Sequence, residues 1–121
     1  MSTVELTVEN FDEVVSANDF VVIDFWASWC GPCRQFAPVY ERAANKHEDI
    51  VFATVDTEAQ QQLAAAFEVR SIPTLAVIRE KVLVYANPGA IPESTLEDLL
   101  QQARDLDMDE VRAKSVPPAE S

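Results

Sequence analysis

Residues 20–27 form a segment that is almost entirely apolar and rich in β-branched and aromatic side chains: Phe-Val-Val-Ile-Asp-Phe-Trp-Ala. A strand with one solvated face alternates apolar and polar residues. A run without that alternation therefore predicts a strand that is covered on both faces, in the middle of a sheet with helices on both sides. The one interruption is Asp24, a carboxylate at a position where burial without a partner is costly.

The residues before this segment predict one strand and one short helix. Val4, Leu6 and Val8 alternate with polar residues, which predicts a half-buried strand. Asn10 and Glu13 have the spacing of a capping box, so we expect the Asn10 side chain to cap a helix that begins there.

The residues after it continue to alternate between helix and strand. An apolar stripe at helical spacing predicts a helix from Arg34 to His47, kinked by Pro38 and ending with His47 as its cap. The order predicts an α/β domain with parallel strands and right-handed crossovers. The further predicted elements are a strand over 50–55, a helix capped by Thr57 with Gln60, a closing strand pair over 74–78 and 82–85, and a helix from about Pro92 to Leu106.

Length and charge limit what the chain can be. Its 121 residues suit one domain with its own core. The formal net charge is −12, so we expect neither nucleic acid nor an anionic membrane as a partner. No run approaches the roughly 20 apolar residues of a membrane-spanning helix, and the acidic N-terminal residues are not typical of a secretory leader. We therefore expect a cytoplasmic protein in a reducing compartment.

The motif that carries chemistry is Trp29-Cys30-Gly31-Pro32-Cys33, between the central strand and the long helix. A thiol at a helix N-terminus meets the positive end of the helix dipole and free backbone amides, both of which favour the thiolate. Cys30 is in that place, and Cys33 follows about one turn later, close enough to form a disulfide with it. We expect Cys30 to attack and Cys33 to resolve.

Three other interpretations of the two cysteines are weaker. A structural zinc site needs about four ligands, but the chain has two cysteines and a single histidine, His47, so we expect no metal. A purely stabilising disulfide would close a very small loop and would be reduced in the cytosol. Two inert core cysteines are the third interpretation, and the Gly-Pro pair between them counts against it.

The motif and its surroundings together resemble the thioredoxin family. The resemblance covers roughly residues 3–106 and rests on Phe25-Trp-Ala-Ser-Trp-Cys-Gly-Pro-Cys33, then Pro38, then Ser71-Ile-Pro-Thr74, then Gly89. It implies a bacterial-type thioredoxin domain over residues 1–106. Residues 107–121 would be a short C-terminal extension that lacks an apolar pattern and is partly disordered.

The family implies an α/β thioredoxin fold with a mixed five-stranded central sheet flanked by four helices. It also implies that Pro73 is cis, beside the dithiol. An extended substrate would pair with the backbone of Ile72 like an added strand. The implied substrate-binding residues are Trp29, Gly31, Pro32, Ile72, Pro73, Thr74, Gly89 and Ala90.

Asp24 matches the buried acid of the family, which implies proton exchange with Cys33; the alternative is an edge position or a local hydrogen bond. The resemblance implies a monomer with no bound cofactor besides the redox-active Cys30–Cys33 disulfide. Its substrates would be proteins that contain disulfides. A thioredoxin reductase, a nicotinamide-dependent flavoprotein, would recycle it, because this chain has no nucleotide-binding fingerprint.

The chain departs from the family pattern at two places. The third strand, residues 51–55, has no lysine near the buried acid, and the turn at Arg79-Glu80-Lys81 has no glycine, which leaves its geometry open. Two rival functions are a binding subunit without turnover and a disulfide-forming oxidase or isomerase. The intact cysteines count against the first. The Gly-Pro pair counts against the second, as do the N-terminal residues, in which we expect no secretory leader.

Overall fold

Strand β2 (Phe20–Trp26) lies in the centre of a five-stranded sheet, as its apolar sequence predicts. The computed structural model describes residues 3–114 of the chain. Within them the strand order is β1-β3-β2-β4-β5. Strands β1 (Thr3–Glu5) and β3 (Val51–Asp56) run parallel to β2, whereas β4 (Thr74–Arg79) is antiparallel to β2 and β5 (Val82–Pro88) is antiparallel to β4. The expected mixed sheet is confirmed.

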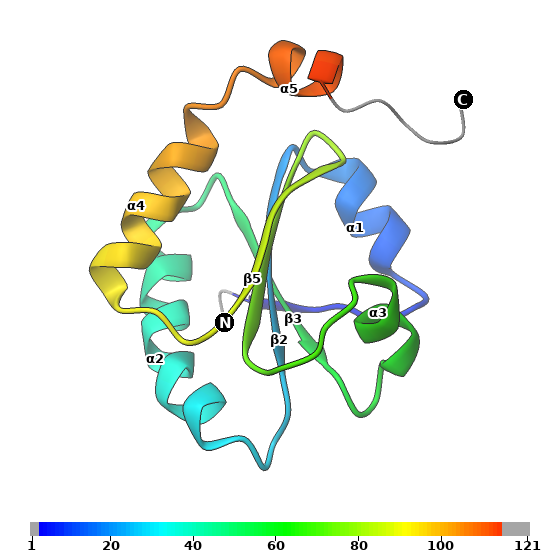
Figure 1. Cartoon of the computed structure of the whole chain (residues 1–121), viewed down its shortest axis with the longest axis vertical. Coiled ribbons are helices and arrows are strands. Elements are labelled where there is room, and N and C mark those ends of the chain that lie inside the picture. The colour runs from blue at the N-terminus through cyan, green and yellow to red at the C-terminus, as the bar shows by residue number, and fades with distance from the viewer. Residues whose placement is uncertain (1–2, 115–121) are drawn as a thin grey trace.

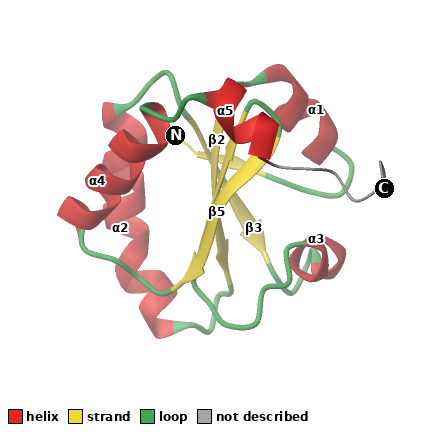
Figure 2. Cartoon of the chain, turned by 45° about the horizontal axis from the view of Figure 1, so that its top comes forward, coloured by secondary structure: helices red, strands yellow, loops and turns green. Residues whose placement is uncertain are grey.

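The alternation of side chains along β2 supplies both layers of the core. Phe20 and Val22 pack under helices α2 (Gly31–Lys46) and α4 (Glu93–Arg104) on one face. Val21, Ile23 and Phe25 pack under α1 (Phe11–Ala17) and α3 (Gln61–Ala66) on the other. Figures 1 and 2 show these two pairs of helices on opposite sides of the sheet. By its even position Asp24 belongs to the α2 side.

Helix α2 forms where the apolar stripe predicts it and continues through Pro38. The proline lies on the exposed side of the helix, where its missing N–H does not disturb the apolar contacts. His47 is the C-cap, and its backbone N–H donates to the Ala43 carbonyl at 3.1 Å. The predicted helix and its end at His47 are confirmed, although the helix begins at Gly31, before the predicted start at Arg34. The kink at Pro38 stays a prediction.

Two predicted side-chain caps are wrong. The Asn10 side chain does not cap α1, because its Oδ1 instead accepts a hydrogen bond from the Thr7 N–H at 2.7 Å. The Thr57 hydroxyl donates to the carbonyl of Trp26, the last residue of β2, at 3.0 Å, and α3 begins after Gln60 without a side-chain cap. In both cases the side-chain oxygen bonds a backbone group outside the helix that it was expected to cap.

The N-terminal strand is shorter than its alternating pattern predicts. It ends at Glu5, and of the three apolar residues only Leu6 is buried, while Val4 is 39% exposed and Val8 is 47% exposed. The strand lies at the edge of the sheet, so there is too little of the α1–α3 layer beside it to cover all three side chains.

The turn between β4 and β5 consists of Glu80 and Lys81, with φ values of 50° and 70°. Two consecutive positive φ values match the two-residue turn that fits the twist of a hairpin, here made without glycine.

No helix within residues 3–114 has the length and apolar character to span a bilayer.

A fifth helix, α5 (Met108–Lys114), follows α4 and was not predicted. Met108 is only 5% exposed, and the Arg112 guanidinium pairs with Glu80 at 2.5 Å, which ties the helix to the β4–β5 turn. One buried side chain leaves no apolar periodicity to detect, so the pattern after Leu106 predicted no element. The expected disorder of the last residues concerns positions 115–121, outside the described part of the chain.

Candidate active site

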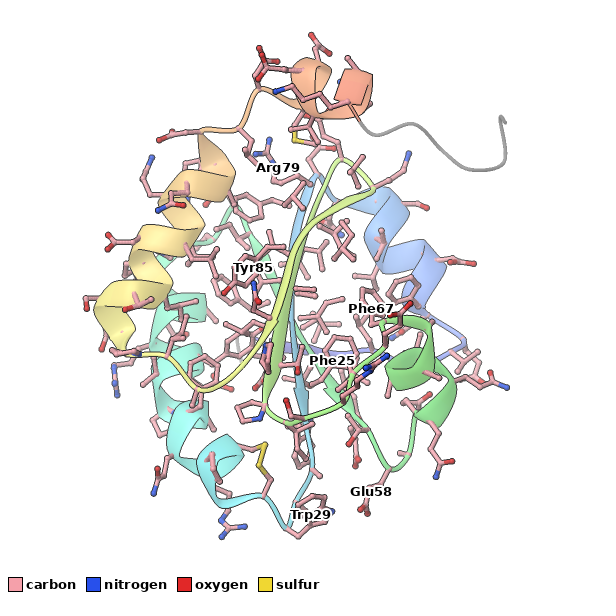
Figure 3. All side chains as sticks on the ribbon, viewed as in Figure 1. Phe25, Trp29, Glu58, Phe67, Arg79 and Tyr85 are labelled. Carbon is pink, nitrogen blue, oxygen red and sulfur yellow. A yellow bond between two sulfur atoms is a disulfide. The ribbon has the colours of Figure 1, made fainter. Side chains whose placement is uncertain are left out.

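The two cysteines lie where β2 delivers the chain to the first turn of α2. Cys30 is the N-cap of α2, and its Sγ accepts a hydrogen bond from the Cys33 N–H at 3.2 Å. The two residues form a disulfide with their Cα atoms 5.2 Å apart. This disulfide is visible at one end of the molecule in Figure 3. A thiolate at this N-cap would be held by a free backbone amide and the helix dipole.

Cys30 lines a groove between the start of α2 and the segment before β4. The groove is a hollow of about 480 Å³ whose walls include Trp29, Pro32 and Ile72. Cys30 Sγ lies 3.7 Å from the Ile72 carbonyl oxygen, and the Ile72–Pro73 peptide bond is cis. Since β4 begins only at Thr74, Ile72 pairs with no strand of the sheet.

Trp29 forms the outer wall of this groove. Its side chain is 65% exposed, yet its indole N–H donates to Glu58 Oε2 at 2.5 Å. Figure 3 shows the two labelled side chains near each other at the disulfide end. Glu58 thus holds an exposed aromatic ring in one orientation, a role that the sequence analysis missed.

Three separated segments bring the remaining predicted docking residues to the same end. Gly31 and Pro32 lie in the first turn of α2 and line the groove. The Gly89 N–H donates to the Pro73 carbonyl at 2.7 Å, and the φ of Gly89 is +109°, which favours glycine there. Ala90, next to it, is exposed. Contact of these residues with a substrate stays a prediction.

Thr74 is placed differently from the other predicted docking residues. It is 7% exposed, and its hydroxyl donates to the Ser71 carbonyl at 2.6 Å. This bond spans the Ile72–Pro73 pair, so Thr74 supports the shape of the loop that faces Cys30.

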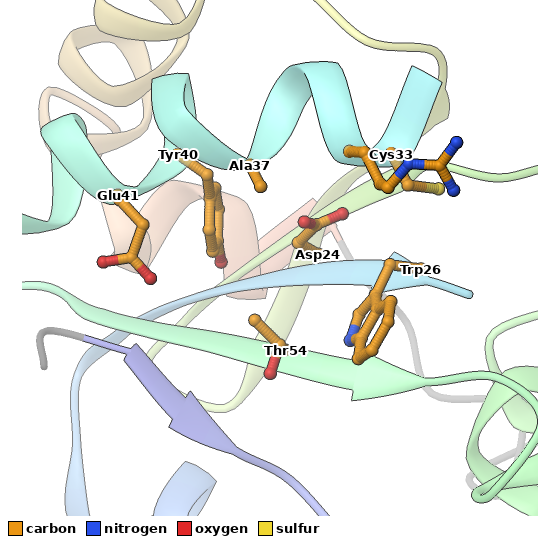
Figure 4. Close-up of a pocket in the computed structure, with 8 residues that line it drawn as sticks. Asp24, Trp26, Cys33, Ala37, Tyr40, Glu41 and Thr54 are labelled. Atoms are coloured by element: carbon orange, nitrogen blue, oxygen red, sulfur yellow. The ribbon is translucent and has the colours of Figure 1, made fainter. Parts of the chain in front are cut away.

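Cys33 opens on a second hollow, a cavity of about 240 Å³ between α2 and the sheet. Figure 4 shows the carboxyl of Asp24 directed from β2 toward α2 within it. Asp24 is 4% exposed, and among the residues that the structure describes its Oδ1 has no hydrogen-bond partner. Burial raises the pKa of Asp24 from 3.8 to about 7. The edge position considered as an alternative for Asp24 is therefore excluded.

The sheet side of this cavity brings no positive charge to Asp24. Thr54 is the residue of β3 in register with Asp24, and it lines the cavity. Strand β3 has no lysine, in agreement with the departure from the family pattern noted in the sequence. Trp26, two residues after Asp24 in β2, lines the cavity as well. The one cation among the lining residues is Arg34 of α2, whose guanidinium donates to the Ser28 carbonyl at 2.8 Å.

Further cavity residues come from α2 and were not singled out from sequence. The Tyr40 hydroxyl lies 2.9 Å from the Val22 carbonyl oxygen and 2.7 Å from that of Ala53, and burial raises the pKa of Tyr40. Tyr40 and Glu41 lie seven and eight residues after Cys33. That spacing places them on one helix face and could have identified them.

No group of three or more His, Cys, Asp or Glu side chains within residues 3–114 is arranged to hold a metal ion. His47 lies at the far end of α2 from the disulfide. Its ring nitrogens contact Glu97 at 2.8 Å and Arg104 at 3.1 Å. The chemistry that the site offers is that of the dithiol and the buried carboxyl.

Comparisons with known proteins agree with this geometry. A family model described as Thioredoxin matches residues 2–102. The chain is 65% identical over 111 residues to "Putative thioredoxin 2" of Streptomyces coelicolor, which covers 92% of this chain and 83% of that protein. It is 42% identical over 103 residues to thioredoxin C-3 of Corynebacterium nephridii, with 84% and 71% covered.

Solved structures show the same likeness. The chain is similar to a mutant thioredoxin from Halobacterium salinarum with a TM-score of 0.80 and 35% identity, covering 86% of this chain and 92% of that one. It is also similar to the short form of thioredoxin f from spinach chloroplast, with a TM-score of 0.79, 31% identity, and 85% and 94% covered.

Proposed function

The chain belongs to the thioredoxin family and is a dithiol-disulfide oxidoreductase, and from this premise we propose that it reduces disulfides of other proteins in the cytoplasm. The observation that carries the proposal is that the two cysteines line different hollows. Cys30 lines the open groove beside Trp29 and Ile72, whereas Cys33 lines the cavity that holds Asp24. This arrangement supports Cys30 as the sulfur that meets a partner and Cys33 as the sulfur that exchanges a proton with Asp24.

In the proposed reaction the reduced protein attacks first through Cys30. Its thiolate forms a bond to one sulfur of the substrate disulfide, and the other substrate sulfur leaves as a thiolate that takes a proton from water. Cys33 then gives its proton to the Asp24 carboxylate and attacks Cys30 Sγ. The second substrate sulfur leaves as a thiolate, so the substrate gains two electrons and Cys30 and Cys33 become a disulfide.

Asp24 suits the proton step because of its environment. A base works best when its pKa lies near the working pH, and burial raises the pKa of Asp24 to about 7. The carboxyl accepts the proton of Cys33 without help from a lysine on β3. The unpartnered Oδ1 leaves an acceptor position free for that proton.

Substrate docking is proposed to follow strand addition. An extended segment carrying the substrate cysteine would pair with the free backbone of Ile72, while Trp29, Gly31, Pro32, Pro73, Gly89 and Ala90 form the surrounding surface, supported by Thr74. The protein would act as a monomer. The oxidised protein would be recycled by a separate thioredoxin reductase, a nicotinamide-dependent flavoprotein.

Reduction of insulin followed by its turbidity tests the proposal. With dithiothreitol as the reductant the assay reports exchange alone, and with a thioredoxin reductase and NADPH it reports exchange together with recycling. We expect both arms to proceed and Cys30→Ser to be inactive in both. Failure of the reductase arm alone would overturn the recycling partner, and failure of both arms would overturn the reductase function.

A further inference from the structure

The residues that line the groove beside Cys30 include one cation and no carboxylate, although the chain as a whole is acidic. The chain has nine Lys and Arg residues and a net charge of −12. Six of the nine cations are paired with carboxylates, each in an ion pair away from the groove: Arg42, Lys46, Arg79, Arg104, Arg112 and Lys114.

Three cations have no carboxylate partner among residues 3–114, and they differ in position. Arg34 donates to the Ser28 carbonyl at 2.8 Å. Lys81 lies in the β4–β5 turn, at the end of the sheet opposite the disulfide, because β4 runs from Thr74 beside Phe25 to Arg79 beside Phe20. Arg70 lies two residues before Ile72 and is exposed.

Arg70 is the one charged side chain that lines the groove beside Cys30 in the described chain. It also lines a smaller hollow of about 190 Å³ on the other side of Ser71, next to Glu68 and Asn87. No ion pair joins Arg70 to Glu68 within residues 3–114, so the described chain supplies no carboxylate partner for the Arg70 guanidinium. A substrate chain paired with Ile72 would pass directly beside it.

We propose that Arg70 selects substrates that carry an acidic side chain next to the cysteine attacked by Cys30. This inference rests on the proposed function. In an extended chain, residues on either side of the cysteine lie within a few ångströms of the strand with which they pair, so a Glu or Asp there can reach a guanidinium two residues from Ile72. Arg is suited to this because its planar fork binds a carboxylate through two parallel hydrogen bonds.

The selection acts only at short range. A protein with a net charge of −12 repels acidic partners at a distance, but the Debye length is about 8 Å at physiological ionic strength. Once a substrate is docked, the Arg70 guanidinium lies next to its side chains, and carboxylates far from the groove are screened. The nearby carboxylate of Glu58 is hydrogen-bonded to the Trp29 indole and is not among the residues that line the groove. Arg70 touches no reacting atom, so it is a specificity-determining residue whose removal changes KM more than kcat.

The test compares disulfide peptides that are identical except for Glu, Gln or Lys on both sides of the cysteine. The second-order rate of their reduction by the pre-reduced protein is measured at about 0.15 M salt. The readout is the ratio of the Glu peptide rate to the Gln peptide rate. We expect Arg70→Gln to lower this ratio about two- to fivefold, the range of an exposed ion pair, and Arg70→Glu to lower it further.

Matched controls separate this effect from net charge and from activity. Lys81→Gln removes one positive charge at the end of the sheet opposite the disulfide, and it should leave the ratio of the Glu peptide rate to the Gln peptide rate unchanged. Bis(2-hydroxyethyl) disulfide, a neutral substrate without a peptide, should be reduced equally by the parent and by all variants. A ratio that is the same in the parent and in Arg70→Gln, with the neutral disulfide reduced normally, overturns the inference and leaves the proposed function intact. A parent that reduces no disulfide overturns both.

Discussion

Cys33 and Asp24 line one cavity, the sulfur from the first turn of α2 and the carboxyl from the centre of β2. The groove that Cys30 lines is a separate hollow, which shares no lining residue with this cavity. The disulfide thus contributes one sulfur to each of two hollows.

The first prediction concerns the unequal cysteines. In Cys33→Ser the attack by Cys30 can occur but cannot be resolved, so a mixed disulfide with a substrate protein should accumulate. Mass spectrometry of the reaction mixture without added thiol measures it. Cys30→Ser is the matched control and should trap nothing. Trapping by Cys30→Ser instead would reverse the assigned roles.

The second prediction concerns stability and pH. Because burial raises the pKa of Asp24 from 3.8 to about 7, the folded protein holds a proton that the unfolded chain releases between those values. The free energy of unfolding contributed by this group therefore falls as pH rises from about 4 to about 7, by up to about 4 kcal/mol. Asp24→Leu has no carboxyl to ionise, so it does not lose this stability as pH rises. It should therefore be more stable than the parent above pH 7.

Denaturant unfolding of both proteins at about pH 4.5 and pH 8 measures this difference. The stability gap between variant and parent should be larger at the higher pH by about 2–4 kcal/mol. Asp24→Asn has the same shape without the ionisation, so the pH dependence of its gap should match that of Asp24→Leu. An equal gap at both pH values would show that Asp24 ionises without cost.

The third prediction concerns the rate of resolution. Asp24 accepts a proton only when ionised, so its assistance to Cys33 should grow as pH rises through about 7. Asp24→Asn should slow release of the reduced substrate from the mixed disulfide on the order of 100-fold at about pH 8. Single-turnover quenching measures the step. A parent and a variant with the same pH profile would exclude Asp24 as the acceptor.

The fourth prediction concerns the bond between Trp29 and Glu58. Glu58→Gln keeps a hydrogen-bond acceptor, whereas Glu58→Ala frees the indole ring, which is 65% exposed. Glu58→Ala should raise KM for insulin about two- to fivefold with little change in kcat, because an exposed hydrogen bond to a charged group contributes on the order of 1 kcal/mol. Equal effects on kcat and KM would instead place Glu58 in the chemistry.

The fifth prediction concerns α5. Met108 is 5% exposed, so Met108→Ala should lower the free energy of unfolding by about 2 kcal/mol or more, as truncation of a buried Met does. Lys114→Ala, in the same helix, removes an exposed i,i+4 pair and should change stability by no more than about 0.5 kcal/mol. Urea unfolding measures both. Equal losses would show that Met108 does not anchor the helix.

Several features follow from short stretches of sequence. The uninterrupted apolar run of β2 predicts its central place, because a strand covered on both faces has no need of polar residues. The apolar stripe of α2 predicts that helix through Pro38 to His47, and the positions of Cys30 and Cys33 relative to its start follow from counting along the chain.

Other features depend on residues that meet only when the chain is packed. Trp29 and Glu58 are 29 residues apart, and nothing local to either predicts their bond. The caps expected at Asn10 and Thr57 fail because the same polar atoms bond other backbone groups: Asn10 that of Thr7, and Thr57 that of Trp26 at the end of β2.

What the sequence by itself determined is the order of the elements and the chemical groups at the end of β2, because periodicity and helix position are properties of neighbouring residues. What the tertiary structure decided is which groups share a hollow. Asp24 and Cys33 line one cavity because α2 packs over β2, and Arg70 lines the groove of Cys30 because the segment before β4 lies beside the N-cap of α2. These contacts join distant positions, and the burial that raises the pKa of Asp24 exists only in the packed chain.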